Sequence, residues 1–331
     1  MKRLTTFAAR ILLAPALRIG LFIVQFIALS MALAGTAAAQ QPATAPRFTL
    51  NLPAAGTPAA QADHSVQFIG TATVLIRYGG LTILTDPNFL HKGDHVHLGY
   101  GLTSERQTDP AIEFDALPPI DFVLLSHLHD DHFDKLVREK LKRSTPIVTT
   151  TSAAAELRKL GFTATMGLGT WQELQVTKGD TTLRVTAMPG RHGPVAVAAL
   201  LPPVMGTMLD FSSAAGRYRI YVSGDTMVYG DIEEIPRRFP GTDLALLHLG
   251  GTRILGIVTV TMDAKEGVRM LKLIAPHRAI PIHYNDYDVF KSPLADFQKA
   301  VDEAGLADKV SYLKHGETYR FQPVTAAAPA R

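Results

Sequence analysis

Cysteine is absent from this chain of 331 residues, and tryptophan occurs once, at Trp171. Without cysteine, the fold has no disulfide to stabilise it, and the chain offers neither a thiolate ligand for a metal nor a cysteine nucleophile. Stability must therefore come from a large apolar core, which a chain with 47% hydrophobic residues can supply. We expect Trp171 to belong to that core.

A strong excess of one charge is also lacking, because 33 basic residues face 30 acidic ones. Residues 1–39 contain four basic residues and no acidic one, which leaves 29 basic and 30 acidic residues in the remainder. A binding surface for nucleic acid needs clustered positive charge, and none is visible here. We therefore predict a small-molecule substrate and no nucleic-acid partner. The oligomeric state cannot be read from these patterns.

The first 39 residues have the layout of a secretory signal peptide. A basic front precedes an apolar stretch over residues 19–34, and small residues at 37–39 form a cleavage site before Gln40. The apolar stretch is short for a membrane-spanning helix. We predict a cleavable leader over 1–39, a periplasmic or secreted location, and no stable membrane insertion after cleavage. An uncleaved membrane anchor is the alternative.

The remaining chain divides into three segments. Residues 40–63 are rich in Ala, Pro, Thr and Gln, which indicates a flexible linker. Residues 64–322 form one domain, and 323–331 form a disordered tail. A long loop over 88–119 contains His91, His95 and His97, which either cover a site or are solvated.

Apolar runs and turn residues predict the order of the elements in the domain. Strands are expected over 65–69, 74–78, 81–85, 147–150, 219–222, 244–248 and 279–282, with antiparallel strands between Trp171 and Ser212. Helices are expected over 133–143, 152–160, 262–274 and 293–304, the third beginning near Thr261 or Asp263. This order fits an α/β fold in which two sheets face each other with helices outside.

Residues 126–132, Ser-His-Leu-His-Asp-Asp-His, contain the densest group of potential metal ligands. His127, His129, Asp131 and His132 follow an apolar strand and precede a helix. Imidazole and carboxylate groups hold zinc and similar ions where no thiolate is present. At such an edge of a sheet, we expect the side chains of His127 and His129 to point in the same direction. We expect those of Asp131 and His132 to point toward a second position next to it. The spacing therefore predicts two adjacent metal ions.

Three more ligand-type residues stand at strand ends. His192 lies in a turn-rich loop, Asp225 follows a buried strand, and His283 follows the last strand. Sites in layered folds collect at such edges. We predict that all three join the first cluster.

At this point the chain resembles the metallo-β-lactamase fold superfamily. The motif over 127–132 carries the resemblance, and residues 68–77, 84–87 and 117–121 resemble a branch with the N-acyl-phosphatidylethanolamine phospholipase D enzymes and the ascorbate-6-phosphate lactonases. The resemblance implies a four-layer αβ/βα sandwich. It also implies a first metal held by His127, His129 and His192, a second held by Asp131, His132 and His283, and Asp225 bridging both.

Two positions depart from that branch. Thr71 stands where many relatives have histidine, and Thr261 stands where the phospholipases have histidine before the acidic residue of the late helix. Phospholipase activity is therefore not transferred, and neither is β-lactamase activity, since a fold does not determine a function.

Several residues receive predicted roles around the metals. Asp131 is expected to orient an activated water, and His248, at the end of a buried strand, is expected to bind substrate or protonate the leaving group. Asp86 either fixes a histidine tautomer or only forms a turn. Tyr284 and Asn285 are expected to line the pocket, and His64, His277 and His315 to be structural or exposed.

These observations favour an exported binuclear hydrolase that uses a hydroxide shared by two divalent ions to cleave an ester, lactone, amide or phosphodiester. Zinc is the favoured ion, with manganese and iron open. A non-catalytic periplasmic metal-binding or sensing module on the same fold is the alternative. A redox enzyme with two irons is a third interpretation.

Overall fold

The computed structural model describes residues 46–54, 63–99, 101–254 and 256–325. The predicted leader and most of the predicted linker lie outside these ranges. Among the described residues, no helix has both the length and the hydropathy needed to cross a membrane. Two sheets of seven strands dominate residues 46–325.

The first large sheet has the strand order β19-β2-β3-β4-β7-β8-β9. Its strands are β2 (Ser65–Gly70), β3 (Thr73–Tyr78), β4 (Leu81–Thr85), β7 (Phe122–Leu124), β8 (Ile147–Thr150), β9 (Thr165–Leu168) and β19 (Thr318–Arg320). The Gly79-Gly80 turn joins β3 to β4, and both glycines have the positive φ that a tight hairpin turn requires. From β4 to β9 the pairs are parallel.

The second large sheet has the order β1-β10-β11-β12-β13-β14-β17. Its strands are β1 (Phe48–Leu52), β10 (Glu173–Lys178), β11 (Thr181–Met188), β12 (Gly206–Ser213), β13 (Gly216–Val222), β14 (Leu244–His248) and β17 (Arg278–Ile282). The antiparallel strands β10–β12 confirm the prediction for the stretch from Trp171 to Ser212, and β13 corresponds to the strand predicted over 219–222. The parallel pairs β13–β14 and β14–β17 need crossovers, which contain α5 (Glu234–Arg238) and α6 (Ala264–Ile274).

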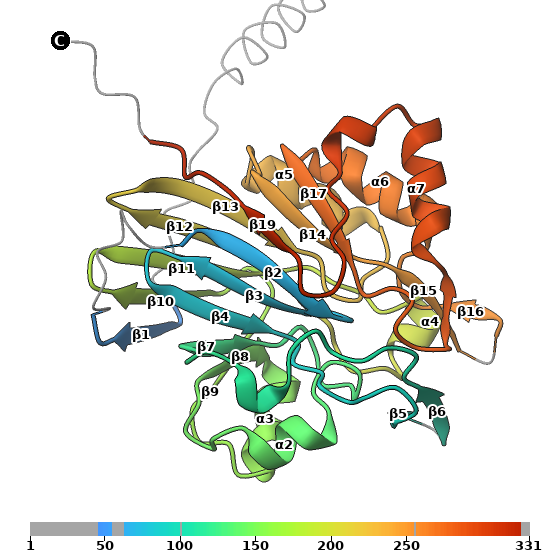
Figure 1. Ribbon diagram of the computed structural model, residues 1–331, viewed down its shortest axis with the longest axis horizontal. Helices are drawn as coiled ribbons and strands as arrows, with labels where there is room; N and C mark the ends of the chain where they lie inside the picture. Colours follow the sequence, from blue (N-terminus) through green and yellow to red (C-terminus); the bar gives the residue numbers. More distant parts are fainter. Residues whose placement is uncertain (1–45, 55–62, 100, 255, 326–331) are drawn as a thin grey trace, which may run out of the picture. The chain divides into compact units, whose positions relative to one another are not determined.

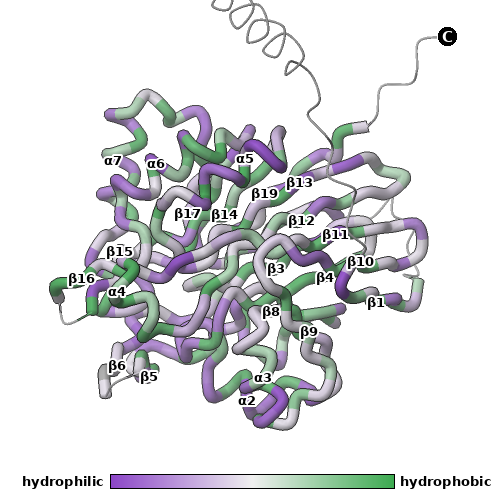
Figure 2. Tube along the Cα trace, turned by 180° about the vertical axis from the view of Figure 1, so that it is seen from behind, coloured by the Kyte–Doolittle hydropathy of each residue, from purple (hydrophilic) through white to green (hydrophobic). Residues whose placement is uncertain are grey.

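Helices cover part of the outer face of each sheet (Figure 1). α2 (Lys135–Lys140) and α3 (Thr151–Lys159) pack on the first sheet, and α6 and α7 (Leu294–Glu303) pack on the second. Between the sheets, side chains such as Phe68, Leu209 and Ile280 form the shared core. Hydrophobic segments run through the strands, whereas α2 is strongly hydrophilic (Figure 2). The predicted four-layer α/β sandwich is confirmed.

The late helix begins where a side chain caps it. Asp263 is the N-cap of α6, and its carboxylate accepts a hydrogen bond of 3.0 Å from the backbone N–H of Glu266. Of the two predicted starting residues, Asp263 is therefore the cap.

Two predicted irregular segments contain strands. The segment predicted as a flexible linker contains β1, because Phe48, Leu50 and Leu52 alternate inward and pack on the core. The loop predicted over 88–119 contains the hairpin of β5 (His95–Gly99) and β6 (Leu102–Glu105) and a 3-10 turn, Phe114–Ala116. In the predicted tail, Val324 pairs with Arg217.

A three-stranded sheet of order β16-β15-β18 lies beyond the end of β14. It consists of β15 (Gly250–Ile254), β16 (Val258–Thr259) and β18 (Phe290–Ser292). The short helix α4 (Val195–Ala198) appears in the same region in Figure 1. The remaining elements are the 3-10 helices Gly230–Glu233 and Ala307–Lys309.

Candidate metal centre and its pocket

The ligand-rich loop lies where β7 gives way to α2, as predicted. Asp86 holds the end of β7, because its Oδ1 accepts hydrogen bonds from Ser126 N at 2.7 Å and Ser126 Oγ at 3.0 Å. The chain then turns tightly, and the backbone N–H of His132 donates to His129 O at 3.0 Å. Asp134 caps α2 through Val137 N at 2.8 Å. Both ends of the loop are therefore fixed by buried carboxylates.

His127, His129 and His192 form the first group of potential ligands, with ligand atoms within 4.8 Å of one another. His127 Nε2 lies 2.9 Å from His129 Nδ1. The other ring nitrogen of His127 faces Ser126 Oγ at 3.0 Å, and Nδ1 of His192 faces Val260 O at 2.7 Å. These partners hold the rings so that Nε2 of His127 faces His129 and the second ring nitrogen of His192 is left for the site.

Asp131, His132, Asp225 and His283 form the second group. Oδ2 of Asp225 lies 3.3 Å from His132 Nε2 and 3.6 Å from His283 Nε2. Oδ2 of Asp131 lies 3.4 Å from His283 Nε2. His283 Nδ1 faces Leu249 O at 3.1 Å, which leaves Nε2 for a ligand. All seven predicted ligands therefore come together in these two groups.

The electrostatics differ between the groups. Burial, aided by neighbouring imidazoles, lowers the pKa of His127 well below its usual value and that of His129 to about 4. Burial also lowers the pKa of His192. These three imidazoles are neutral near pH 7, which is the form that binds a metal.

In the second group the charges stabilise one another. Burial favours the neutral carboxylic acids, but His132 and His283 outweigh it and hold the pKa of Asp131 at about 2 and that of Asp225 well below its usual value. Burial likewise opposes protonation of His132 and His283, but the carboxylates, with Asp225 foremost, raise the pKa of both. A metal binding here displaces these protons.

The donor atoms fit divalent metal ions. Oδ1 of Asp131, Oδ1 of Asp225 and both ring nitrogens of His132 are buried without a hydrogen-bond partner among the described residues. Buried polar atoms are costly to leave unsatisfied, and a cation would satisfy them. Histidine nitrogens with carboxylate oxygens are the ligand chemistry of zinc, manganese and iron sites.

A third group connects the metal centre to the core. Asp86 Oδ1 lies 3.5 Å from His132 Nδ1, and Asp86 Oδ2 lies 3.4 Å from His248 Nε2. This arrangement leaves Nε2 of His132 facing the second group. Asp86 thus contacts a ligand from behind, as one of the two sequence interpretations predicts, and it also forms a turn with φ of +33°.

The structure does not bring His248 to the pocket. The residue is fully buried, and its ring nitrogens face Ser223 Oγ at 3.2 Å and Asp86 Oδ2 at 3.4 Å. The proton-donor role predicted for His248 stays a prediction, and the observed contacts are those of a residue that positions Asp86.

Strained backbone surrounds the ligands. Thr71, His283 and Asn285 adopt left-handed conformations with φ of +52°, +61° and +59°. Such conformations persist only where the surroundings enforce them. Here the backbone N–H of His283 donates to Thr71 O at 2.6 Å, which fixes the turn that carries the ligand.

A small pocket of about 80 Å³ opens onto the metal ligands His129, Asp131, His192 and Asp225. Aliphatic side chains form most of its wall, namely Leu98, Leu201, Ile254, Val260 and Val289. Thr103, Thr252 and Arg253 are its other polar lining residues. The pocket therefore presents a largely aliphatic wall above a floor of potential metal ligands.

Several other predicted residues lie elsewhere. Tyr284 packs in the core between the sheets, and Asn285 is exposed, so the prediction that both line the pocket is wrong. Because the backbone turns in a left-handed conformation at His283, the side chain of Tyr284 points into the core while the imidazole of His283 faces the other potential ligands. His95 and His97 lie on β5 beside the pocket-lining Leu98, but they are exposed and do not line the pocket.

His64, His277 and His315 are structural or exposed, as predicted. His277 pairs with Asp243 and His315 with Asp286, while His64 packs on Tyr78. His91, whose role the sequence left open, pairs with Glu113 and does not line the pocket. Trp171 is only half-buried and stacks on Phe239 at the edge of the core.

Sequence reasoning missed two supports of the site. Thr261 Oγ1 donates to Asp225 Oδ2 at 3.2 Å. Arg106 is fully buried and donates from Nη1 to Thr71 Oγ1 at 2.6 Å, while Thr71 N donates to Asp286 Oδ2 at 2.8 Å. The two threonines that depart from the relatives' histidines are thus polar contacts of the site. No motif around Arg106 signals this role.

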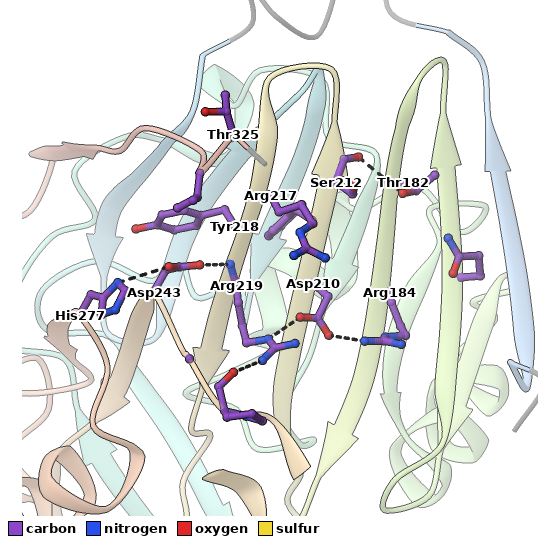
Figure 3. A pocket seen from close by; sticks show the side chains of 15 residues that line it. Thr182, Arg184, Asp210, Ser212, Arg217, Tyr218, Arg219, Asp243, His277 and Thr325 are labelled. Carbon is purple, nitrogen blue, oxygen red and sulfur yellow. Dashed lines mark hydrogen bonds and ion pairs between the residues drawn. The ribbon is translucent and has the colours of Figure 1, made fainter. Parts of the chain in front are cut away.

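A larger hollow of about 740 Å³ lies on the outer face of β11–β13 (Figure 3). Asp210 pairs across the strands with Arg184 at 3.0 Å and with Arg219, and Asp243 contacts His277 at 3.4 Å. None of the three potential metal-binding groups in the described residues includes a residue of this hollow. We interpret it as a solvated sheet face stabilised by cross-strand ion pairs.

Replacing Asp210 with alanine is expected to lower the free energy of unfolding by about 1 kcal/mol, because the two ion pairs are partly exposed and screened. Metal content and turnover should stay unchanged. Urea unfolding and elemental analysis measure these effects, and a loss of metal from this variant would contradict the separation of the two regions.

The comparisons with known proteins agree with this geometry. Residues 82–284 match the family model described as Beta-lactamase superfamily domain. A UPF0173 metal-dependent hydrolase of Archaeoglobus fulgidus is 30% identical over 207 residues, which cover 61% of this chain and 82% of the relative. One of Methanosarcina mazei is 28% identical over 261 residues, covering 78% of this chain and all of the relative.

Solved structures show the same fold. The isothiocyanate hydrolase from Delia radicum gut bacteria aligns with a TM-score of 0.67 and 23% identity, covering 78% of this chain and 99% of that one. A possible metal-dependent hydrolase from Veillonella parvula aligns with the same score and identity, covering 78% of this chain and 100% of that one. With the family match spanning more than half of its length, the chain belongs to the metallo-β-lactamase superfamily and is a relative of the UPF0173 metal-dependent hydrolases.

Proposed function

We propose that this protein is an exported hydrolase that depends on two divalent metal ions and cleaves an ester, lactone, amide or phosphodiester of small size. One observation carries the proposal: two adjacent groups of buried histidine and aspartate donors, with unsatisfied carboxylate oxygens, form the floor of a pocket. The names of the UPF0173 relatives support metal-dependent hydrolysis.

His127, His129 and His192 would hold one ion, Asp131, His132 and His283 the other, and Asp225 would contribute to both. Ions bound there would polarise the oxygen of the scissile bond and lower the pKa of a water. Asp131 is placed to orient that water, because it lines the pocket and also contacts His283. The aliphatic wall excludes bulk water, which strengthens the electrostatic interactions inside.

Residues behind the ligands keep the donors aligned. Thr261 fixes one oxygen of Asp225, and Val260 O and Leu249 O fix the rings of His192 and His283. Such contacts select the tautomer and the orientation of each imidazole. We assign His248 and Asp86 to this supporting role for His132.

Zinc is the proposed ion, with manganese and iron as alternatives. We also propose that residues 1–39 direct export, on the basis of their charge and hydropathy pattern. A place near the phospholipase D and lactonase branch remains a prediction from motifs, and Thr71 and Thr261 distinguish this chain within it.

Chelation is expected to abolish hydrolysis, and zinc is expected to restore it. The test uses purified protein, elemental analysis and a panel of chromogenic esters, lactones, amides and phosphodiesters. We expect about two equivalents of metal per chain and a lower melting temperature after chelation, because metals bind only the folded state.

The panel also separates the alternatives. Full metal content with no turnover of any bond class would favour the binding or sensing module. Turnover that survives complete removal of metal would overturn the proposed function. Two iron equivalents with oxygen-dependent activity would instead support the redox interpretation.

A further inference from the structure

The strand β15 supplies two polar residues to the pocket that the metal centre does not use. Thr252 and Arg253 line the pocket beside its aliphatic wall. Their backbone is fixed, because Thr252 O accepts from Val260 N at 2.9 Å and Arg253 pairs with Thr259 on β16. β15 and β16 lie at one end of the described domain in Figure 1. Rigid elements of this kind can hold a side chain for recognition.

The hydroxyl of Thr252 is buried without a partner. The residue is 8% exposed, and Oγ1 has no hydrogen-bond partner among the described residues. Leaving a buried hydroxyl unsatisfied costs free energy, and burial of a threonine for packing alone would be better served by valine. A pocket-lining residue that keeps such a hydroxyl suits a ligand that carries a hydrogen-bonding oxygen.

Arg253 is the one basic residue among the pocket-lining residues, and it is exposed at the surface. No ion pair connects it to a described carboxylate, in contrast to Arg184 and Arg219 in the outer hollow. The acidic lining residues, Asp131 and Asp225, belong to the metal centre. An uncompensated guanidinium at the exposed end of an apolar pocket attracts an anion.

We propose that Thr252 and Arg253 select the substrate, which is a short aliphatic acyl compound bearing an anionic group at the end away from the scissile bond. This inference rests on the proposed hydrolytic function of the same site. The pocket volume of about 80 Å³ admits a chain of only a few carbons. The acyl chain contacts the aliphatic wall, Thr252 donates to an oxygen of the substrate, and Arg253 binds the terminal anion.

Succinate and butyrate are matched probes for this selection, because both have four carbons and only succinate has a second carboxylate. Calorimetry on the metal-loaded protein is expected to show about tenfold tighter binding of succinate, the effect of one charge-assisted hydrogen bond. Arg253→Met should reduce the preference to below about twofold, and Arg253→Lys should retain most of it, because a cation remains. Equal affinity of the wild type for succinate and butyrate would overturn the role of Arg253. So would a preference for succinate that Arg253→Met retains.

Thr252→Val tests the hydroxyl separately. Affinity for both probes should fall about threefold to tenfold, as for loss of one hydrogen bond, while metal content and melting temperature do not fall. Thr252→Ser should restore binding. A variant Thr252→Val that loses stability but keeps its affinity would show a structural hydroxyl and overturn this part.

Turnover separates this inference from the function on which it rests. The substrates are a butyrate ester and the matching succinate monoester of the same alcohol, and the wild type should favour the succinate monoester in kcat/KM. Succinate preference in binding without hydrolysis of any compound would leave the recognition intact and overturn the hydrolase. Equal hydrolysis of both esters, unchanged in Arg253→Met, would overturn the recognition and keep the hydrolase.

Discussion

Replacing Asp225 with alanine is expected to lower kcat by on the order of 10²–10³, the usual effect of losing one electrostatic catalytic group, and to remove metal from the protein. Asp225 is 2% exposed, contacts His132 and His283, and has one oxygen without a partner among the described residues. Its charge also raises the pKa of His127, His129 and His192 against the effect of burial, so it acts on both groups.

The matched control is Asp210→Ala, which removes a carboxylate from β12 in the outer hollow. That variant should keep full metal content and turnover. Elemental analysis and steady-state kinetics on both proteins decide the matter. An Asp225→Ala protein with two metal equivalents and wild-type turnover would refute the assignment of the centre.

The metal centre is readable from sequence because its ligands stand at strand ends. The ligands His127 to His132 follow β7, and His283 follows β17. The ends of these strands meet at one edge of the sheets, so the ligands come together there without depending on the conformation of the longer loops. Apolar runs and the alternation of apolar with polar residues likewise predict most strands of the two seven-stranded sheets. The pocket wall is different, because Leu98 and Ile254 lie on the short hairpins β5–β6 and β15–β16 and Leu201 lies in a loop, and only long-range packing places these segments over the ligands.

Left-handed backbone turns, and strand pairs between segments far apart in the sequence, explain where the predictions from sequence were wrong. The residue after His283 points into the core, because the left-handed turn breaks the alternation of a strand. Phe48 to Leu52 alternate apolar and polar residues, but the pattern is only five residues long and lies in a stretch rich in Ala, Pro and Thr. Its partner β10, with which it pairs in parallel, is more than a hundred residues away along the chain. Arg106 is a further example, since a single buried arginine carries no sequence motif.

Replacing Arg106 with methionine is expected to lower the free energy of unfolding by about 3–5 kcal/mol, because it removes the fully buried cation beside Asp286 and leaves that carboxylate with only the partly exposed His315 as a charged partner. Arg106 and Asp286 are both fully buried, with Nη2 and Oδ1 4.0 Å apart. Burial favours the neutral form of Asp286, but His315, Arg106 and Thr108 outweigh it and lower the pKa below the usual 3.8. This stabilisation is therefore present above pH 3.8 and is lost as the pH falls through the lowered pKa.

The control for this prediction is Arg184→Met, which removes a cation from a partly exposed ion pair and should cost about 1 kcal/mol or less. The double variant Arg106→Met with Asp286→Asn should lose less stability than the sum of the single variants, since neither charge is then left alone. Urea unfolding above pH 6 measures each value. Arg106→Met within 1 kcal/mol of the wild type would contradict a buried, charged pair.

The same network connects stability to the metal centre. Arg106 holds Thr71 Oγ1, and Thr71 O holds the backbone N–H of His283 in its left-handed turn. Loosening Thr71 should therefore weaken the second metal group before the first, whose ligands His127, His129 and His192 contact neither residue. Metal titration of folded Arg106→Met should show one weakened equivalent and one retained. Equal weakening of both equivalents would place the effect of Arg106 in the whole fold rather than in the turn at His283.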